Sequence, residues 1–275
     1  LRLLCAKKID QAQKLAKLLN DTNHERQELT DNLTEIALEL AQSQKNNPVI
    51  IVQHSDFHEG IIGLIASKLV QKFWRPAIVL ALNEKIYKAS ARSIPGFNII
   101  EAIRHNEDLL ESAGGHPMAA GFNIQIDKLE KFTKKFIDHA EKLLTPDLLK
   151  RYLNIDCLLQ FNELNDNLAD ELNLLAPFGI GNSKPILSTT EVTIIDRRTV
   201  GADGKHLKLR LKNNDHQFSA IGFGMGHLHN KLSSDIPVTI AYHLTRKTWK
   251  GNTNLELQLK SIKTEHRDEK TGMVL

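Results

Sequence analysis

The chain has 275 residues, which favours two domains, and its 41% hydrophobic and 25% charged content excludes a largely disordered protein. No apolar run approaches the roughly 20 residues of a membrane span. Only Cys5 and Cys157 occur, too few for a disulfide-stapled secreted domain, so we expect a cytoplasmic protein with no membrane partner. The net charge is +3, but residues from 184 onward carry 15 Lys and Arg against 9 Asp and Glu. That basic third fits a polyanion partner, or merely a well-solvated surface.

The N-terminal segment predicts a long helix. Apolar residues recur at helical spacing, no proline occurs before Pro48, and Asp10 is a plausible N-cap. We expect one helix over residues 10–45, or two in tandem, forming a connector over residues 1–46. Because the sequence begins at Leu1 without a methionine, we also expect it to be part of a longer protein.

Residues 47–145 predict one α/β domain. Apolar strand-like runs alternate with helical patterns, which is typical of a mixed sheet with flanking helices. Strands are expected at 49–54, 76–82, 86–93 and 119–126, and helices at 60–74, 98–105 and 128–144.

The remaining chain predicts an all-β module. Residues 146–183 are expected to be a linker with a helix at 167–175, ending in the Pro- and Gly-containing segment PFGIGNSKP. Five short strands over residues 184–263, with turn signals at Asp203-Gly204 and Asn213-Asn214, favour an OB-fold barrel. The strands are expected at 191–197, 206–212, 218–223, 238–244 and 255–262. Residues 264–275 are polar and predict a tail.

The segment AGGHPMAAGF, residues 113–122, is the most informative about function. Gly114 and Gly115 allow close approach of a ligand to the backbone, and His116 follows immediately. We expect a turn that contacts a ligand. The alternative is a histidine that only hydrogen-bonds to neighbouring backbone.

Two further polar clusters follow predicted strands. His54, Ser55, Asp56, His58 and Glu59 precede a helix start, where anions are favoured, although Ser55 or Asp56 could simply cap that helix.

The second cluster is Lys88, Ser90, Arg92 and Ser93. The period of two puts the first three on one strand face, where a cation, a hydroxyl and a guanidinium would suit a phosphate. A solvated edge strand would look the same. No HExxH, paired CxxC, Walker or GxSxG motif occurs, so we expect no metal ligands here and a binding half of a site, not a catalytic centre.

Four segments together resemble the RecJ family of bacterial single-stranded-DNA-specific exonucleases, which are DHH/DHHA1 phosphoesterases. They are SDFHEGIIGLIASKLVQKFWRPAIVLA, KASARSIPGFNIIEAI, GGHPMAAGF and LAPFGIGNSKPIL. The resemblance identifies residues 1–46 as the connector helix, 47–145 as a DHHA1 domain and the region from 184 as an OB-fold.

The resemblance implies a 5′ to 3′ exonuclease of DNA repair and recombination that degrades single-stranded DNA with Mn²⁺ or Mg²⁺. In the family those metals are held by a DHH domain, of which this sequence has no motif, so we expect the chain to be inactive alone and to carry no cofactor. Arg92 would hold a terminal phosphate and His116 would stabilise charge at the scissile phosphate. The substrate-facing wall would include His58, Lys88, Ser90, Ser93, Gly114 and Gly115.

The OB-fold would grip phosphates through Lys and Arg and stack bases on aromatics. Candidates for stacking are Phe218, Phe223, Tyr242 and Trp249, some of which must fill the barrel. Single-strand-binding protein and a helicase are further expected partners. Two alternatives stay open: part of an oligoribonuclease or pyrophosphatase, and a non-catalytic single-strand-binding module.

Overall fold

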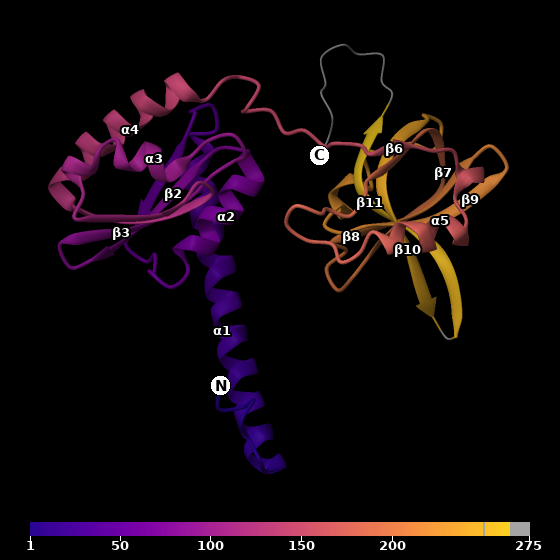
Figure 1. Cartoon of the computed structure of the whole chain (residues 1–275), viewed down its shortest axis with the longest axis horizontal. Helices are drawn as coiled ribbons and strands as arrows, with labels where there is room; N and C mark the ends of the chain where they lie inside the picture. The colour runs from indigo at the N-terminus through magenta and orange to yellow at the C-terminus, as the bar shows by residue number, and fades with distance from the viewer. Residues whose placement is uncertain (250, 265–275) are drawn as a thin grey trace. The chain divides into compact units, whose positions relative to one another are not determined.

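The computed structural model describes residues 1–249 and 251–264, and the chain forms two compact units, Leu1–Tyr152 and Leu153–Leu275 (Figure 1). Each unit has its own hydrophobic core and is described by itself. The linker expected at 146–183 is divided between the units, because its residues from Leu153 onward belong to the second. Apart from Thr264, the predicted tail lies outside the described residues.

The first unit contains a five-stranded mixed sheet. Its strands are β1 (Ile50–His54), β2 (Ala77–Asn83), β3 (Ile86–Arg92), β4 (Ser112–His116) and β5 (Ala119–Gln125). Their spatial order is β1-β2-β3-β5-β4, with β1 and β2 parallel and every other pair antiparallel. The parallel pair needs a crossover, which is a helix, whereas tight hairpins suffice for the antiparallel pairs. The predicted mixed sheet with flanking helices is confirmed.

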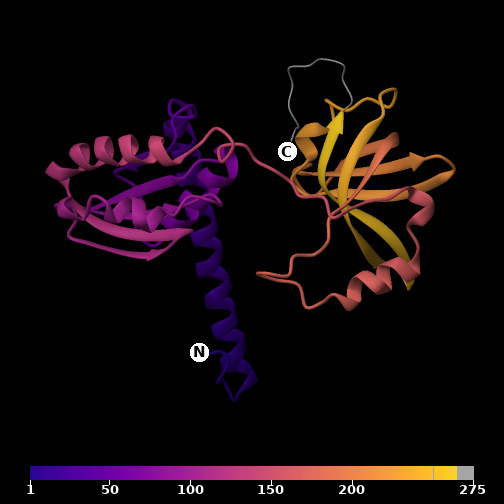
Figure 2. The same cartoon turned by 45° about the horizontal axis from the view of Figure 1, so that its top comes forward.

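Helices cover both faces of this sheet (Figure 2). They are α1 (Ile9–Gln42), α2 (Ile62–Phe73), α3 (Ile99–Arg104) and α4 (Leu129–Leu143). The C-terminal part of α1 and all of α2 pack on one face, and α3 and α4 pack on the other. Phe132 and Phe136 of α4 are fully buried, and burial of such a side chain stabilises the fold by about 1.5–3 kcal/mol.

The predicted connector is a single helix rather than two. In α1 the buried residues begin at Thr30, and the preceding part of the helix is largely exposed, including Leu18 and Leu19. Only the C-terminal part of the apolar stripe is therefore covered within this unit.

The expected turn at Gly114, Gly115 and His116 is wrong. These residues form the end of β4, an edge strand that pairs with β5, and the turn between the two strands is at Pro117 and Met118. Proline lacks a backbone N–H, so the hairpin reverses at Pro117 and the preceding glycines remain in the ladder.

The second unit is a small β-barrel, which confirms the predicted OB-fold. Its strands are β6 (Cys157–Leu158), β7 (Leu187–Val200), β8 (His206–Asn213), β9 (His216–Gly222), β10 (Val238–Trp249) and β11 (Asn252–Thr264). They form the order β10-β11-β9-β8-β7-β6, and β10 also pairs with β7, which closes the barrel. The short β6 was not predicted.

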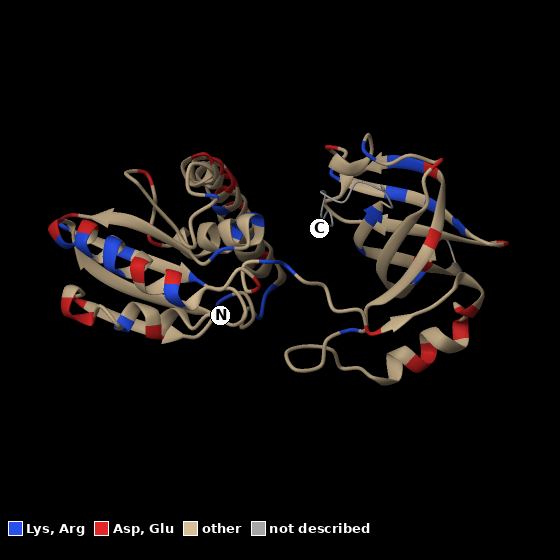
Figure 3. Cartoon of the chain, turned by 90° about the horizontal axis from the view of Figure 1, so that it is seen from above, with Lys and Arg blue, Asp and Glu red and all other residues tan. Residues whose placement is uncertain are grey.

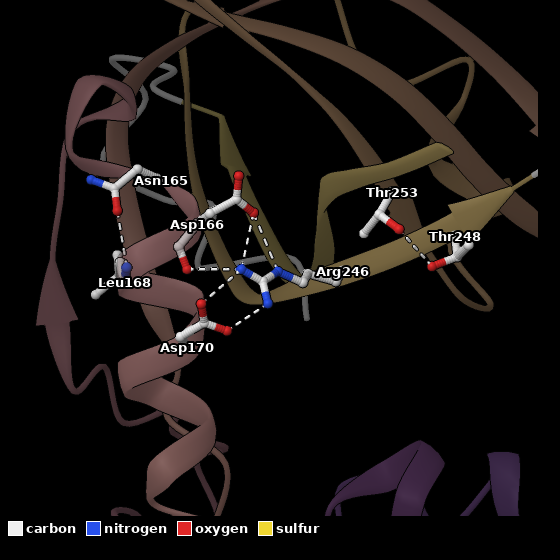
Figure 4. Close-up of polar contacts among 7 residues, drawn as sticks. All are labelled: Asn165, Asp166, Leu168, Asp170, Arg246, Thr248 and Thr253. Carbon is white, nitrogen blue, oxygen red and sulfur yellow. Dashed lines mark hydrogen bonds and ion pairs between the residues drawn. The ribbon is translucent and has the colours of Figure 1, made fainter. Parts of the chain in front are cut away.

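One helix, α5 (Asp166–Leu174), is fixed to the barrel from outside. Asn165 caps its first turn by accepting a hydrogen bond from the Leu168 N–H at 2.9 Å. From β10, the Arg246 guanidinium bonds to the carboxylates of both Asp166 and Asp170 (Figure 4). Because one planar cation bridges two acids on successive helical turns, α5 is held in one orientation.

We predict that acid destabilises the first unit through His139. Its ring stacks on that of His105 at 3.9 Å, and burial, followed by the charges of His105 and Lys142, lowers the pKa of His139 below its ordinary 6.5. Since the folded state favours the neutral ring, this stability is complete above pH 6.5 and is lost as the pH falls from there through the lowered folded pKa.

Calorimetry between pH 7.5 and 5 should show this loss for the wild-type chain, and it should be smaller for His139→Gln. Asn20→Ala, a change of a non-titrating side chain at an exposed position on α1, should keep the wild-type profile. Identical profiles for wild type and His139→Gln would contradict the assignment.

Candidate nucleic-acid interface

Three rows of residues cross β3, β5 and β4 on the face of the sheet toward α2. The strand register places them opposite one another; the rows are Arg92–Ala119–His116, Ser90–Gly121–Gly114 and Lys88–Asn123–Ser112. The alternate residues point into the core formed with α3 and α4. The structure therefore brings Lys88, Ser90 and Arg92 onto one face, and adds Gly114 and His116 to it from strands that the sequence does not show to be adjacent.

Arg92 is held in position by its own strand and by a gap in α2. Its Nη1 donates hydrogen bonds to the Ser90 Oγ at 3.0 Å and to the Ala91 carbonyl at 2.9 Å. A Cβ on Gly63 would lie 2.7 Å from Arg92 Nη2 and 3.2 Å from Ser90 Oγ. Gly63 thus leaves the space that the guanidinium occupies. Gly63 was not among the predicted site residues, although a second glycine three residues after Gly60 was a visible signal.

Lys88 is paired with an acid. Its ammonium group contacts the carboxylate of Glu59, which precedes α2. The hydrogen bond and charge of Lys88 hold the pKa of Glu59 below its ordinary value, so the Glu59 carboxyl is ionised at neutral pH. Lys88 is therefore less available to a phosphate than Arg92, for which the described residues provide no carboxylate within ion-pair distance.

The two glycines of β4 serve different purposes. Gly115 has φ +149°, and a Cβ there would lie 2.5 Å from the Ala119 carbonyl oxygen and from the Ala120 Cα. Gly114 has an ordinary backbone, and a Cβ there would meet nothing within 4 Å. Gly115 is thus required by the hairpin, whereas Gly114 keeps the open face of the sheet flat.

His58 and Ser93 are placed differently from one another. His58 is exposed, and its Nδ1 accepts a hydrogen bond from the Gly60 N–H at 3.1 Å, so the neutral ring carries its proton on Nε2. Ser93 is buried, and its hydroxyl donates to the Phe97 carbonyl at 2.6 Å. The Ser93 side chain thus holds the loop after β3 and is not on the open face of the sheet, where phosphate binding was expected.

The described residues contain no cluster suited to a metal. No group of three or more His, Cys, Asp and Glu among them could hold an ion. Around the rows, Arg92 and Lys88 are cationic, and Glu59, the one acid among the described residues that contacts either of them, is already paired. These residues do not fit Mn²⁺ or Mg²⁺, which prefer carboxylate and other oxygen ligands.

The barrel carries cations along one strand. In β8, buried leucines alternate with Lys208, Arg210 and Lys212, which lie on the outer face, and Arg198 of β7 lies opposite Lys208. Figure 3 shows Lys and Arg positions in blue on several strands of the barrel. Lys208 contacts the buried carboxylate of Glu256. Within the described part of the chain, Arg198, Arg210 and Lys212 form no ion pair. Three unneutralised cations on neighbouring strands suit a phosphate backbone.

The structure shows, for three of the four candidate aromatic residues, whether the side chain fills the barrel or is exposed. Tyr242 is fully buried and its hydroxyl shares a hydrogen bond with Thr189 at 2.9 Å, and burial raises the pKa of Tyr242 to about 12. Phe218 packs edge-on against buried Phe161. Phe223 is 58% exposed and is supported edge-on by His206 at 5.3 Å. The Trp249 side chain lies outside the described residues. Of the three, Phe223 is the one free to stack on a base.

Comparison with known proteins agrees with this two-domain arrangement. The DHHA1 domain family matches residues 46–142, and the RecJ OB domain family matches residues 155–261. The single-stranded-DNA-specific exonuclease RecJ of Bacillus subtilis (strain 168) is 31% identical over 261 residues, covering 94% of this chain and 33% of that protein. The enzyme of the same name from Haemophilus influenzae is 28% identical over 270 residues, which cover 93% of this chain and 46% of that protein.

A solved structure is also similar. The crystal structure of RecJ from Thermus thermophilus in complex with Mn²⁺ matches with a TM-score of 0.79 and 28% identity, over 96% of this chain and 38% of that one. The fold therefore defines a DHHA1 domain followed by an OB domain of the RecJ type. The chain belongs to the RecJ family, and it spans between a third and a half of the length of these relatives.

We predict that Gly63→Ala displaces the Arg92 guanidinium without unfolding the domain. The added methyl meets the far end of a flexible side chain, so the thermal midpoint should change little. Loss of a charge-assisted hydrogen bond should weaken binding of inorganic phosphate by about tenfold. Thermal denaturation and an NMR titration with phosphate measure the two effects, with Gln71→Ala on the exposed face of α2 as the control. Unchanged phosphate affinity in Gly63→Ala would remove Gly63 from the site.

We predict opposite outcomes for the two β4 glycines. Gly115→Ala forces a residue with a Cβ into a left-handed conformation against backbone atoms, and should lower the free energy of unfolding by about 1–3 kcal/mol. Gly114→Ala should leave it within about 0.5 kcal/mol, since nothing lies near the new methyl. Urea denaturation compares them, and equal destabilisation would show that the hairpin geometry is different.

Proposed function

We propose that the chain is the substrate-binding part of a 5′ to 3′ single-stranded-DNA exonuclease that acts in DNA repair and recombination. The observation that carries this proposal is the register that places Arg92, Ser90 and His116 on one open face of the first unit. A guanidinium oriented by its own strand suits the terminal phosphate of a strand, and an imidazole in the same row suits developing charge at the scissile phosphate. The RecJ relatives support the choice of substrate.

The barrel adds a second contact with the strand. Arg198, Arg210 and Lys212 would hold phosphates by charge, and exposed Phe223 would stack on a base. A small phosphorylated substrate, as of a pyrophosphatase, would not need this second surface. The barrel therefore favours a polynucleotide.

Hydrolysis would depend on metal ions held by residues outside these 275 positions. Structures of RecJ relatives contain Mn²⁺ or Mg²⁺, whereas the rows in the first unit do not fit a metal. We propose that a DHH domain supplies the metals and that this chain alone binds DNA without cleaving it. The role of the rows is then to hold the phosphates in place.

We place the protein in the cytoplasm, with single-strand-binding protein and a helicase as further partners, by its resemblance to the RecJ family. Within the described ranges, the structure has no helix that is both long and apolar enough to traverse a bilayer.

A chimaera tests the proposal. We replace the matching part of Bacillus subtilis RecJ by this chain and follow Mn²⁺-dependent release of nucleotides from 5′-labelled single strands. Degradation is expected. A chimaera that binds single strands but does not degrade them would favour a non-catalytic binding module, and one that cleaves only dinucleotides or pyrophosphate would favour a small-substrate hydrolase.

We predict a kinetic distinction within the chimaera. Arg92→Ala should mainly raise KM, because its contact with the terminal phosphate is made in the ground state as well. His116→Ala should mainly lower kcat, by about 100-fold, if it stabilises charge that develops during the reaction. Steady-state kinetics measures both. Wild-type kinetics in both variants would show that this face does not contact the substrate.

We predict that the chain alone binds single-stranded DNA with a steep salt dependence. Arg210→Ala should reduce the slope of log K against log salt by about 0.7, since one phosphate contact is lost. Phe223→Ala should cost about 1–3 kcal/mol of affinity, and Leu174→Ala, which removes an 83% exposed leucine from α5, should cost none. Fluorescence anisotropy measures these changes, and a flat salt response would contradict the proposed barrel contact.

A further inference from the structure

Residues of two of the rows, Ser90–Gly121–Gly114 and Lys88–Asn123–Ser112, line a groove on this face, and Arg92 lies one row beyond it. The groove has a volume of about 430 Å³, and it runs between the start of α2 and the strands β3, β5 and β4. The residues that matter here are Glu59, Lys88, Ser90, Ser112, Gly121 and Asn123. The row Lys88–Asn123–Ser112 forms one end, and Ser90 leads from there toward Arg92 and His116. Of this far row, only Lys88 was expected to contact a substrate.

The two ends of the groove differ in charge. At the Ser90 end, the Arg92 guanidinium reaches the groove through its hydrogen bond to the Ser90 Oγ, and it has no carboxylate within ion-pair distance among the described residues. At the other end the charge of Lys88 is matched by Glu59, so that row is neutral overall. A phosphate is attracted to the Arg92 end, whereas the paired charges at the Lys88 end give a phosphate no net attraction.

The neutral end has free hydrogen-bonding groups. Asn123 Nδ2 donates to Ser112 Oγ at 3.0 Å, across neighbouring strands. This bond leaves the Asn123 Oδ1 as an acceptor and the Ser112 hydroxyl proton as a donor, and among the described residues neither has another partner. Acceptors and donors at a neutral surface suit the hydroxyl, amino and carbonyl groups of a nucleoside.

The floor between the two ends is bare. Gly121 and Gly114 occupy the middle row and present no side chain, and a Cβ at Gly114 would meet no atom within 4 Å. Rows two residues apart on a strand are separated by about 7 Å, which is about the length of one nucleoside. The Arg92 guanidinium reaches the middle row, because its Nη1 donates to the Ser90 Oγ at 3.0 Å. A ligand whose phosphate lies over Ser90 can therefore extend by one row to Asn123 and Ser112.

We propose that Asn123 and Ser112 form a nucleoside-recognition subsite, which holds the sugar and base of the nucleotide whose phosphate is bound by Arg92 and Ser90. This inference rests on the proposed function. Glu59 acts on it as a positioning residue, because it fixes Lys88 beside Asn123 and neutralises the charge of Lys88. The site thus has room for one nucleotide, with the phosphate at its charged end and the nucleoside at its neutral end.

The test uses the whole 275-residue chain and NMR titrations with four probes: inorganic phosphate, deoxyribose 5-phosphate, thymidine 5′-monophosphate and thymidine. We expect the nucleotide to bind more tightly than inorganic phosphate. Asn123→Ala should weaken nucleotide binding by about tenfold and leave the affinity for inorganic phosphate unchanged. Arg92→Ala should weaken both, and Asn20→Ala, on the exposed part of α1, should change neither.

The probes separate the possible failures. If inorganic phosphate and the nucleotide bind equally well, or if Asn123→Ala leaves both affinities unchanged, the nucleoside subsite is wrong while the phosphate end stands. If the wild-type chain binds neither, the phosphate end of the proposed function fails, and the subsite fails with it. If deoxyribose 5-phosphate and the nucleotide bind with equal affinity, and Asn123→Ala lowers both affinities, Asn123 contacts the sugar. If the nucleotide binds more tightly than deoxyribose 5-phosphate, Asn123 contacts the base. Ser112→Ala, on an exposed edge strand, repeats the measurement if Asn123→Ala does not fold.

Discussion

The alternation of side chains along β3, β5 and β4 is the constraint on which the rest of the first unit depends. On each strand, one set of residues faces the core with α3 and α4, so the other set must face the side of α2. Because α2 packs against β2 and β3, the residues of β5 and β4 on that side remain partly open. A groove with polar residues at its ends and glycine in its middle is the direct result.

The charges of the side chains then make the two ends of the groove different. Glu59 neutralises Lys88, but no acid among the described residues neutralises Arg92. Two cations of the same strand therefore differ in how readily they bind an anion. The barrel shows the same separation: Lys208 is tied to buried Glu256, whereas Arg210 and Lys212 are not paired within the described chain. In both units, the cations left without an acid are the ones suited to a phosphate.

Much of this could be predicted from residue patterns. Period-two spacing placed Lys88, Ser90 and Arg92 on one face, and five short strands with turn signals indicated the barrel. The prediction failed at Gly114–His116, because two glycines beside a histidine are typical of a turn, and Pro117 moves the reversal by two residues. Ser93 was grouped with Arg92 by sequence proximity, but its hydroxyl is used by the loop that follows.

By itself, the sequence determined the order of the domains, the period of each element and the family, since all three depend on residues close together in the chain. Tertiary structure alone decided which distant residues share a surface. Asn123 and Ser112 carry no motif and meet only because β4 and β5 pair, and Gly63 matters only because α2 lies over Arg92. Strand pairing and helix packing join positions far apart in sequence, and no local pattern records the distance between them.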